Sequence, residues 1–206
     1  MADCSKAALI VIDHQLGTFD PNFWGNAQSN PSYSENLQSL LAAFRAFKDG
    51  PLAPHVIHVY HRSINPHSPL YPGNPTMNIR EDAAPLPSEP VFSKSTNSAF
   101  VKPELGAYLK EKDIRRIYFV GLSIDMCVGS TIRHASDLAI GSYVNGEEES
   151  VRGDIVLIED AVAAWAKHGG SYDAETVHGV HVESLRGEFA RVVTTVEALK
   201  ELRIGG

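Results

Sequence analysis

Short runs of hydrophobic residues recur along the whole chain, and most of their residues belong to types that favour β-strands. Within each run the apolar positions follow one another with few polar interruptions. Continuous apolar character is typical of a strand covered on both faces, as in a parallel sheet flanked by helices. The pattern therefore predicts buried strands at residues 7–13, 55–60, 115–121, 154–160 and 190–195, with a shorter sixth candidate at 90–94.

Amphipathic segments with helical spacing lie between these runs. Leu37, Leu40, Leu41 and Phe44 fall on one face of the segment 34–47, which predicts a helix there. Similar patterns predict helices at 128–141, 174–187 and 197–202. Because strands and helices alternate, we predict an α/β fold with a doubly wound parallel sheet between two helical layers (α/β/α). The length of 206 residues fits a single domain that spans residues 1–206.

Two long irregular segments stand out from this alternation. Residues 14–32 and 62–89 each follow a predicted strand and have no helical or strand pattern of their own. Long loops in a compact domain are usually functional, and open α/β sheets bind ligands at the carboxyl ends of their strands. Phe19, Phe23 and Trp24 on the first loop are therefore candidate walls of a substrate pocket, although ordinary loop packing explains them equally well.

Composition and charge narrow the class of protein. Hydrophobic residues make up 43% of the chain and charged residues 21%, as in ordinary globular proteins. The formal net charge of -7 argues against nucleic acids and anionic membranes as partners, because phosphate binding needs a basic surface. No signal peptide and no membrane-spanning stretch are recognised, so we expect a cytoplasmic protein. The two cysteines, Cys4 and Cys127, indicate no disulfide framework.

Three side chains capable of chemistry follow three of the predicted strands. Cys127 comes after a tight turn, in the first turn of a helix, where the helix dipole favours a thiolate and free N–H groups can bind an oxyanion. A buried structural cysteine is the alternative and carries about equal weight. Asp13 ends the first strand, where it suits a general base or simply starts a turn. Lys94 would pair with Asp13 and favour a thiolate nearby, unless it is an ordinary surface lysine.

These residues lie in three stretches that resemble the signatures of the isochorismatase-like cysteine hydrolases. The stretches are "VIDHQ" with Asp13, "FSKSTNSAF" with Lys94 and "VGLSIDMCVGSTIRHA" with Cys127. The resemblance covers nearly the whole chain, and it implies a six-stranded parallel sheet and a homo-oligomer, either a dimer or a tetramer. It also implies that Asp13 takes the thiol proton, that Lys94 stabilises the thiolate and orients Asp13, and that Cys127 attacks a carbonyl.

The resemblance extends to the backbone beside the nucleophile. It implies a cis peptide bond between Leu122 and Ser123, and an oxyanion hole formed by the backbone amides of Ser123 and Cys127. The polar stretch at 145–154, by contrast, is an insertion relative to the family. We expect it to form a solvated turn or short hairpin, away from the carboxyl ends of the strands and without a catalytic role.

The chain departs from the metal-binding members of the family. Nicotinamidases hold a metal through an Asp-x-His pair and a second histidine, whereas the corresponding region here has His61 and His67 without the aspartate. Because this set is incomplete for zinc, we expect no metal and no cofactor. His61 and Arg62 are instead candidate substrate-binding residues, together with Phe19 and Trp24.

The leading functional prediction is a cysteine-dependent hydrolase that cleaves the C–N bond of a small amide through a thioester. A second candidate is the hydrolysis of isochorismate, in which Asp13 would protonate a vinyl ether. Members dedicated to that reaction often have Gly at the position of Cys127, which favours the amide. A third is an inactive binding or scaffold protein, and the complete set of Asp13, Lys94 and Cys127 argues against it. The residues do not identify the small-molecule substrate.

Overall fold

The hydrophobic runs form one six-stranded sheet in the computed structural model, which describes residues 6–47 and 53–204. Every neighbouring pair of strands is parallel, as the continuous apolar pattern predicts. Cys4 lies outside the described residues. Across the sheet the strands follow in the order β3 (Val91–Lys94), β2 (His55–His61), β1 (Ala7–Ile12), β4 (Arg116–Leu122), β7 (Asp154–Ala163) and β8 (Arg191–Val193).

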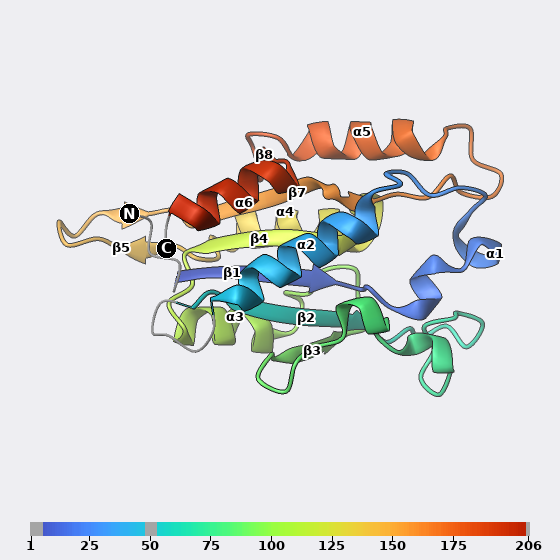
Figure 1. Ribbon diagram of the computed structural model, residues 1–206, viewed down its shortest axis with the longest axis horizontal. Helices are drawn as coiled ribbons and strands as arrows, with labels where there is room; N and C mark the ends of the chain where they lie inside the picture. The colour runs from blue at the N-terminus through green and yellow to red at the C-terminus, as the bar shows by residue number, and fades with distance from the viewer. Residues whose placement is uncertain (1–5, 48–52, 205–206) are drawn as a thin grey trace.

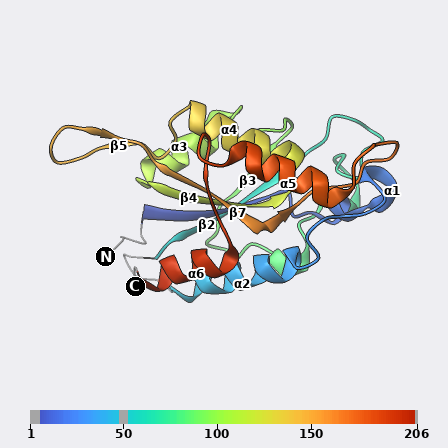
Figure 2. The same cartoon turned by 90° about the horizontal axis from the view of Figure 1, so that it is seen from above.

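Two layers of helices cover the faces of this sheet (Figure 2). One layer contains α2 (Tyr33–Ala46) and α6 (Thr195–Ile204), and the other contains α3 (Pro103–Glu111), α4 (Gly129–Asp137) and α5 (Ala174–Leu185). The predicted three-layer α/β/α architecture with a six-stranded parallel sheet is thereby confirmed. None of the described helices combines the length and the apolarity needed to cross a bilayer.

The central strand β1 contributes to a hydrophobic core on each side of the sheet. All six of its residues are buried. Ala8, Ile10 and Ile12 join the core beneath α3, α4 and α5, while the residues between them join the core beneath α2 and α6. Successive side chains of a strand point to opposite faces, so a strand covered twice must be apolar at every position. The apolar run of β1 therefore ends at Ile12, and the first polar residue, Asp13, lies beyond the end of the strand.

The direction in which the chain moves across the sheet reverses between β1 and β4, which lie side by side (Figure 1). The chain moves outward from β1 to β2 and β3, then returns to the other side of β1 and continues through β4, β7 and β8. The connection that leaves β1 therefore runs toward one edge of the sheet, whereas the connection that leaves β4 runs toward the other edge. Open α/β sheets bind ligands at the carboxyl ends of such a pair of strands. Asp13 follows β1 and Cys127 follows β4 at this point.

The two long segments predicted as loops contain only short helical turns. They hold η2 (Leu16–Phe19) and α1 (Pro21–Trp24) in the first, and η3 (Pro75–Met77) and η4 (Glu81–Ala83) in the second. Backbone hydrogen bonds join the segments, because the amide of Leu16 donates to Asn78 (2.9 Å) and that of Arg80 donates to His14 (3.1 Å). Both segments therefore lie together at the carboxyl end of the sheet.

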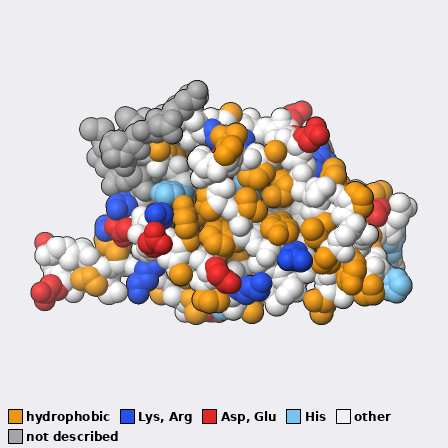
Figure 3. Space-filling view, turned by 90° about the horizontal axis from the view of Figure 1, so that it is seen from below, with side chains coloured by type: hydrophobic (Ala, Val, Ile, Leu, Met, Phe, Trp, Pro, Cys, Tyr) orange, Lys and Arg blue, Asp and Glu red, His pale blue; other side chains and the backbone are white. Residues whose placement is uncertain are grey.

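The polar insertion forms a hairpin of β5 (Tyr143–Val144) and β6 (Ser150–Val151), so the predicted short hairpin is confirmed. It projects from the body at the end of the sheet opposite to the arrowhead of β1 (Figure 1). Acidic side chains gather at its tip (Figure 3), where residues 147–149 are glutamates exposed to solvent. The hairpin is therefore distant from the carboxyl ends of β1 and β4 within this chain (Figure 1).

Candidate active site

The three residues predicted to act together meet at the carboxyl end of the sheet. The ammonium of Lys94 donates to Oδ2 of Asp13 at 2.6 Å and to Sγ of Cys127 at 3.1 Å. A carboxylate oxygen of Asp13 and Sγ of Cys127 lie within 4.8 Å of each other. Asp13 and Lys94 are buried, whereas the thiol is partly exposed. An acid, an ammonium and a thiol from three strand ends thus form one cluster.

Asp13 is held by its backbone at the point where the chain leaves β1. Its amide donates to the carbonyl of Val59 (2.8 Å), and its own carbonyl accepts from the Thr18 hydroxyl (2.9 Å). Beside it, Gly121 of β4 has φ +119°, and a Cβ at this position would lie 2.0 Å from the carbonyl oxygen of Ile12. Only glycine lets the two strands approach here. The other carboxylate oxygen of Asp13, Oδ1, is buried and has no hydrogen-bond partner.

Cys127 lies on a single π-helical turn, η5 (Ile124–Val128), that leads directly into α4. The peptide bond between Leu122 and Ser123 is cis, as the family resemblance implies. The amides of Met126 and Val128 both donate to the carbonyl of Ser123 at 3.1 Å. These bonds close the turn tightly and place the cysteine side chain over the end of β4, facing Lys94.

His61 is the third acceptor for the Lys94 ammonium. It pairs with Lys94 in the register of β2 and β3, and its Nδ1 lies 3.2 Å from Nζ. An ammonium has three protons to donate, and here they have three acceptors: Asp13, Cys127 and His61. Nδ1 can accept only in the neutral imidazole. Burial of the ring, followed by the neighbouring Lys94 charge, lowers the pKa of His61 and favours that form.

Gln15 fixes the backbone of His61. The amide of His61 donates to Oε1 of Gln15 (2.7 Å), and Nε2 of Gln15 donates back to the carbonyl of His61 (3.0 Å) and to that of Met77 (2.6 Å). Gln15 lies within the "VIDHQ" stretch, but sequence reasoning assigned it no role. A buried glutamine must satisfy both ends of its amide, which is the signal that points to such a clamp.

The protonation state of the cluster depends on the balance between burial and the two charges beside the thiol. Burial of the Cys127 thiol and the adjacent Asp13 carboxylate raise its pKa above the usual range, and the Lys94 ammonium only partly offsets this. Burial alone would lower the pKa of Lys94, but Asp13 and the sulfur outweigh it and raise that pKa. The resting site is therefore a buried ammonium–carboxylate pair beside a neutral thiol. Lys94 does favour the thiolate, as the sequence predicts, but burial and the charge of Asp13 outweigh it.

Potential metal ligands also meet here, since Asp13, His61 and Cys127 each offer one atom and these atoms lie within 4.8 Å of one another. Carboxylate, imidazole and thiolate are ligands that zinc accepts. However, Nζ of Lys94 lies within hydrogen-bonding distance of all three residues. A fixed positive charge thus occupies the place that a metal ion would take. His67, the second predicted histidine, lies exposed on the 62–89 segment.

A cavity opens beside the thiol and encloses about 490 Å³ of empty space, including its mouth. Trp24 and His61, two of the predicted substrate-binding residues, line it. Its polar or charged lining residues also include Asp13, Thr18, Asn97 and Ser123, and its apolar or sulfur-containing ones are Trp24, Leu70, Leu122, Met126, Cys127 and Trp165.

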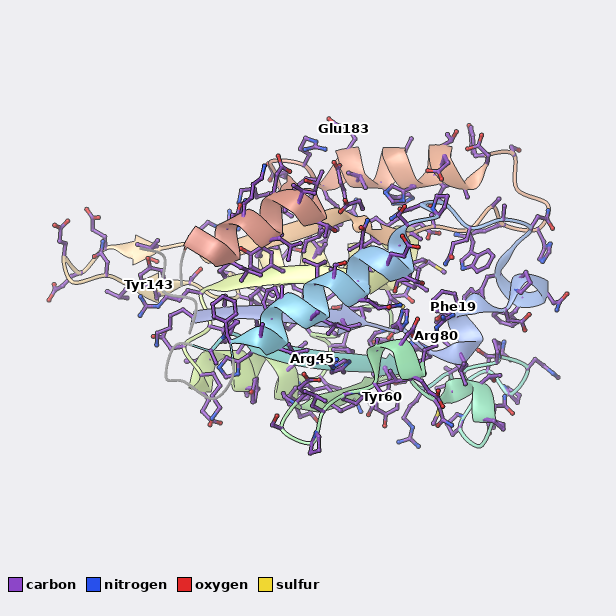
Figure 4. The ribbon with its side chains drawn as sticks, viewed as in Figure 1. Phe19, Arg45, Tyr60, Arg80, Tyr143 and Glu183 are labelled. Atoms are coloured by element: carbon purple, nitrogen blue, oxygen red, sulfur yellow. The ribbon has the colours of Figure 1, made fainter. Side chains whose placement is uncertain are left out.

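The prediction that Phe19 and Arg62 contact the substrate is not supported by their positions, because neither lines this cavity. Phe19 packs edge-on against His14 (5.2 Å between ring centroids), and the guanidinium of Arg80 stacks on its ring at 4.2 Å (Figure 4). Arg62 lines a separate cavity with Lys102. Side-chain direction, which spacing along the chain does not reveal, places these two residues outside the pocket.

Trp165 is a wall residue that sequence reasoning missed. It follows β7 at the same carboxyl edge as Asp13 and Cys127, and this position is the signal that could have identified it. Its indole N–H donates to the carbonyl of Thr18 (3.2 Å), while that of Trp24 donates to the carbonyl of Gly17 (2.7 Å). Consecutive carbonyls of one turn therefore hold both indoles in place.

Comparison with known proteins identifies relatives along nearly the full chain. Residues 7–197 match the model of the isochorismatase domain. An isochorismatase family protein of Bacillus subtilis (strain 168), YrdC, is 31% identical over 199 residues, which cover 95% of this chain and 96% of the relative. A solved isochorismatase-family structure from Chromobacterium violaceum superposes with a TM-score of 0.81 at 30% identity, over 97% of this chain and 95% of that one. A cysteine hydrolase from Pseudomonas syringae pv. phaseolicola shares the fold, with a TM-score of 0.81 at 20% identity over 100% and 96% of the two chains.

Proposed function

The chain belongs to the isochorismatase family of hydrolases, and from this premise we propose that it cleaves the C–N bond of a small amide, with Cys127 as nucleophile. Asp13 acts as general base and acid, and Lys94 remains an ammonium throughout. The second candidate is cleavage of the vinyl ether of isochorismate, with Asp13 as the acid. A thiol in direct contact with the buried Lys94–Asp13 pair favours the amide, because vinyl ether protonation uses no nucleophile.

The observation that carries the proposal is the unpartnered oxygen of Asp13. Lys94 occupies Oδ2, while Oδ1 is buried without a hydrogen-bond partner, and one oxygen of this carboxylate lies within 4.8 Å of the sulfur. A buried carboxylate oxygen without a donor is costly unless a proton is supplied to it. We infer that the neutral thiol supplies that proton at the start of the reaction, which links the base to the nucleophile.

The first half of the reaction forms a thioester. The thiol proton moves to Oδ1 of Asp13 as the sulfur adds to the amide carbon, and the backbone amides of Ser123 and Cys127 hold the resulting oxyanion. The Lys94 ammonium stabilises the sulfur while it carries negative charge. The tetrahedral intermediate then collapses, the C–N bond breaks and Asp13 gives its proton to the departing nitrogen, which leaves as ammonia or an amine.

The second half releases the acid. Water gives one proton to Asp13 as its oxygen adds to the thioester carbon, and the C–S bond then breaks. The sulfur recovers the proton from Asp13, so the site returns to a neutral thiol beside an ion pair. No metal enters either half, in keeping with the Lys94 ammonium that lies between Asp13, His61 and Cys127.

A direct test compares wild type, Cys127→Ala and Cys127→Ser with a panel of small amides and with isochorismate. We expect amide hydrolysis by the wild type alone, and an acyl adduct on Cys127 by mass spectrometry after rapid acid quench. Ser98→Ala is the control, because Ser98 is also buried but pairs with His134 outside the pocket. Isochorismate cleavage that survives the loss of the thiol would instead establish the acid mechanism, and inactivity on every compound would support a binding protein.

A further inference from the structure

The pocket beside Cys127 offers a ligand no free charge. Of its lining residues only Asp13 is charged, and the Lys94 ammonium neutralises it at 2.6 Å. His61 is the other titratable neighbour besides the thiol, and burial and Lys94 favour its neutral form. A charged group on a bound acyl chain would therefore lose its water of hydration without gaining a counter-ion.

The walls of the pocket are mostly apolar, and hydrogen bonds hold its two indoles in place. Trp24, Leu70, Leu122, Met126 and Trp165 supply hydrophobic surface. Both indole N–H groups are already bonded to carbonyls of η2, so they are not free to bind a substrate. The rings therefore present their apolar surfaces to the cavity, and preformed walls of this kind recognise shape at a low cost in conformational entropy.

Cations do lie nearby, but they belong to a different cavity. Arg62 and Lys102 line an open groove with Tyr71, Ser93 and Lys94, and this groove shares no lining residue with the pocket beside the thiol. An anion held there would not contact the walls around Cys127. The two cavities thus separate the charges of Arg62 and Lys102 from the point where the carbonyl must dock.

We propose that the substrates are amides with an uncharged, predominantly apolar acyl group, and that acyl groups carrying a carboxylate are excluded. This proposal rests on the proposed function and specifies its substrate class. Shape is read by Trp24 and Trp165, while Asn97 and Ser123 are the polar residues left to bind neutral hydrogen-bonding atoms. Isochorismate, a dicarboxylate, falls in the excluded class.

The alkylation of Cys127 tests this selectivity without any substrate. Iodoacetamide and iodoacetate are nearly the same size and differ by one negative charge. We expect the ratio of their rate constants at Cys127, measured by peptide mass spectrometry, to exceed that of the unfolded protein by about 10-fold or more, because the pocket cannot pair a carboxylate. An equal ratio in the folded and unfolded protein would overturn the proposal.

Two variants place a cation in the wall. Asn97→Arg changes an exposed lining residue, and Met126→Arg changes a partly buried one, so failure of either to fold leaves the other. Each should bring the ratio back toward that of the unfolded protein, whereas the neutral controls Asn97→Gln and Met126→Gln should keep it high. If neither arginine variant alters the ratio, the selectivity does not arise from the charge of the wall and the proposal is wrong.

Hydrolysis provides the second arm. 4-Methylpentanamide and succinamate have similar shapes, but an isopropyl group in the first replaces the carboxylate of the second. For the wild type, kcat/KM should be about 10-fold or more higher with the uncharged amide than with succinamate. Met126→Arg should reduce this ratio. If no amide is hydrolysed while the alkylation ratio stays high, the proposed function fails but the uncharged pocket stands. Efficient hydrolysis of succinamate would reject the substrate class alone.

Discussion

Nζ of Lys94 lies 2.6 Å from Oδ2 of Asp13, although the two residues are 81 positions apart, and both side chains are almost excluded from solvent. This buried pair has two consequences. It keeps the pocket electrically neutral, and it leaves the Cys127 thiol protonated until a substrate arrives. In the mechanism we propose, the thiol is therefore activated by transferring its proton during the reaction, because a carboxylate beside it opposes a thiolate at rest.

Breaking this pair should destabilise the protein as well as inactivate it. Asp13→Asn leaves a buried ammonium without a counter-charge, and we expect the free energy of unfolding to fall by about 3–5 kcal/mol in urea titrations. The double variant Asp13→Asn with Lys94→Met removes both charges and should recover most of that loss while remaining inactive. If Asp13→Asn were as stable as wild type, the Lys94 ammonium would not depend on Asp13 for compensation.

His61 should act by orienting Lys94 rather than by binding substrate. Asn can place Oδ1 where Nδ1 of His61 lies and can accept from Lys94, whereas Leu cannot accept. We therefore expect His61→Leu to lower kcat by about 10- to 100-fold with little change in KM, and His61→Asn to retain most of the activity. Steady-state kinetics on one amide measures the difference, and an increase in KM in both variants would indicate substrate contact instead.

The same residue should appear in the pH dependence of catalysis. Protonated His61 cannot accept from Lys94, so kcat should fall as the pH drops through the pKa of His61, which burial and Lys94 lower below its usual value of about 6.5. Wild type should thus remain active below the usual pKa of histidine. In His61→Asn this fall in kcat at low pH should be absent. If the fall persisted, it would have to arise from another titrating group.

Glu89 should anchor the 62–89 segment in a pH-dependent way. Burial alone would raise its pKa, but hydrogen bonds from Arg45 (2.7 and 2.8 Å), the Leu86 amide (2.9 Å) and His58 (2.9 Å) outweigh it and lower the pKa. A lowered carboxyl pKa stabilises the fold above the unfolded pKa of about 4.3, and this contribution is lost as the pH falls through the folded pKa.

Glu89→Gln should therefore lower the free energy of unfolding by about 2 kcal/mol near neutral pH, and by progressively less below about pH 4. Urea unfolding of both proteins across this range measures the change. Glu183→Gln is a matched control, because Glu183 pairs with Arg186 at the surface. A difference that did not depend on pH would assign the effect to packing rather than to charge.

Removing the β5–β6 hairpin should leave catalysis intact, since the hairpin lies at the opposite end of the sheet from the pocket (Figure 1). Replacing residues 144–151 with a short glycine linker should change kcat/KM less than about twofold, within the effect usual for distant surface changes. Gel filtration of the same variant reports whether the hairpin contributes to the expected oligomer. Loss of activity would mean that the hairpin of one copy reaches the pocket of another.

The hydrophobic pattern predicted the sheet and the position of the site because both depend on local regularities. Continuous apolar runs require strands that are covered on both faces, and parallel strands bring their carboxyl ends to one edge. Asp13, Lys94 and Cys127 each end or follow such a run, so their meeting required only the order of the strands. The hairpin was equally predictable, because a polar stretch between apolar elements has no core to join.

Only the tertiary structure decided how those side chains share charge and which neighbours complete the pocket. The neutral thiol, the third hydrogen bond from Lys94 to His61, and the indole of Trp165 depend on contacts between strands that are distant in the sequence. The direction of a side chain likewise removed Phe19 and Arg62 from the pocket. Hydrogen bonds and charge balance act over a few ångströms in three dimensions, and the spacing of residues along a chain does not contain those distances.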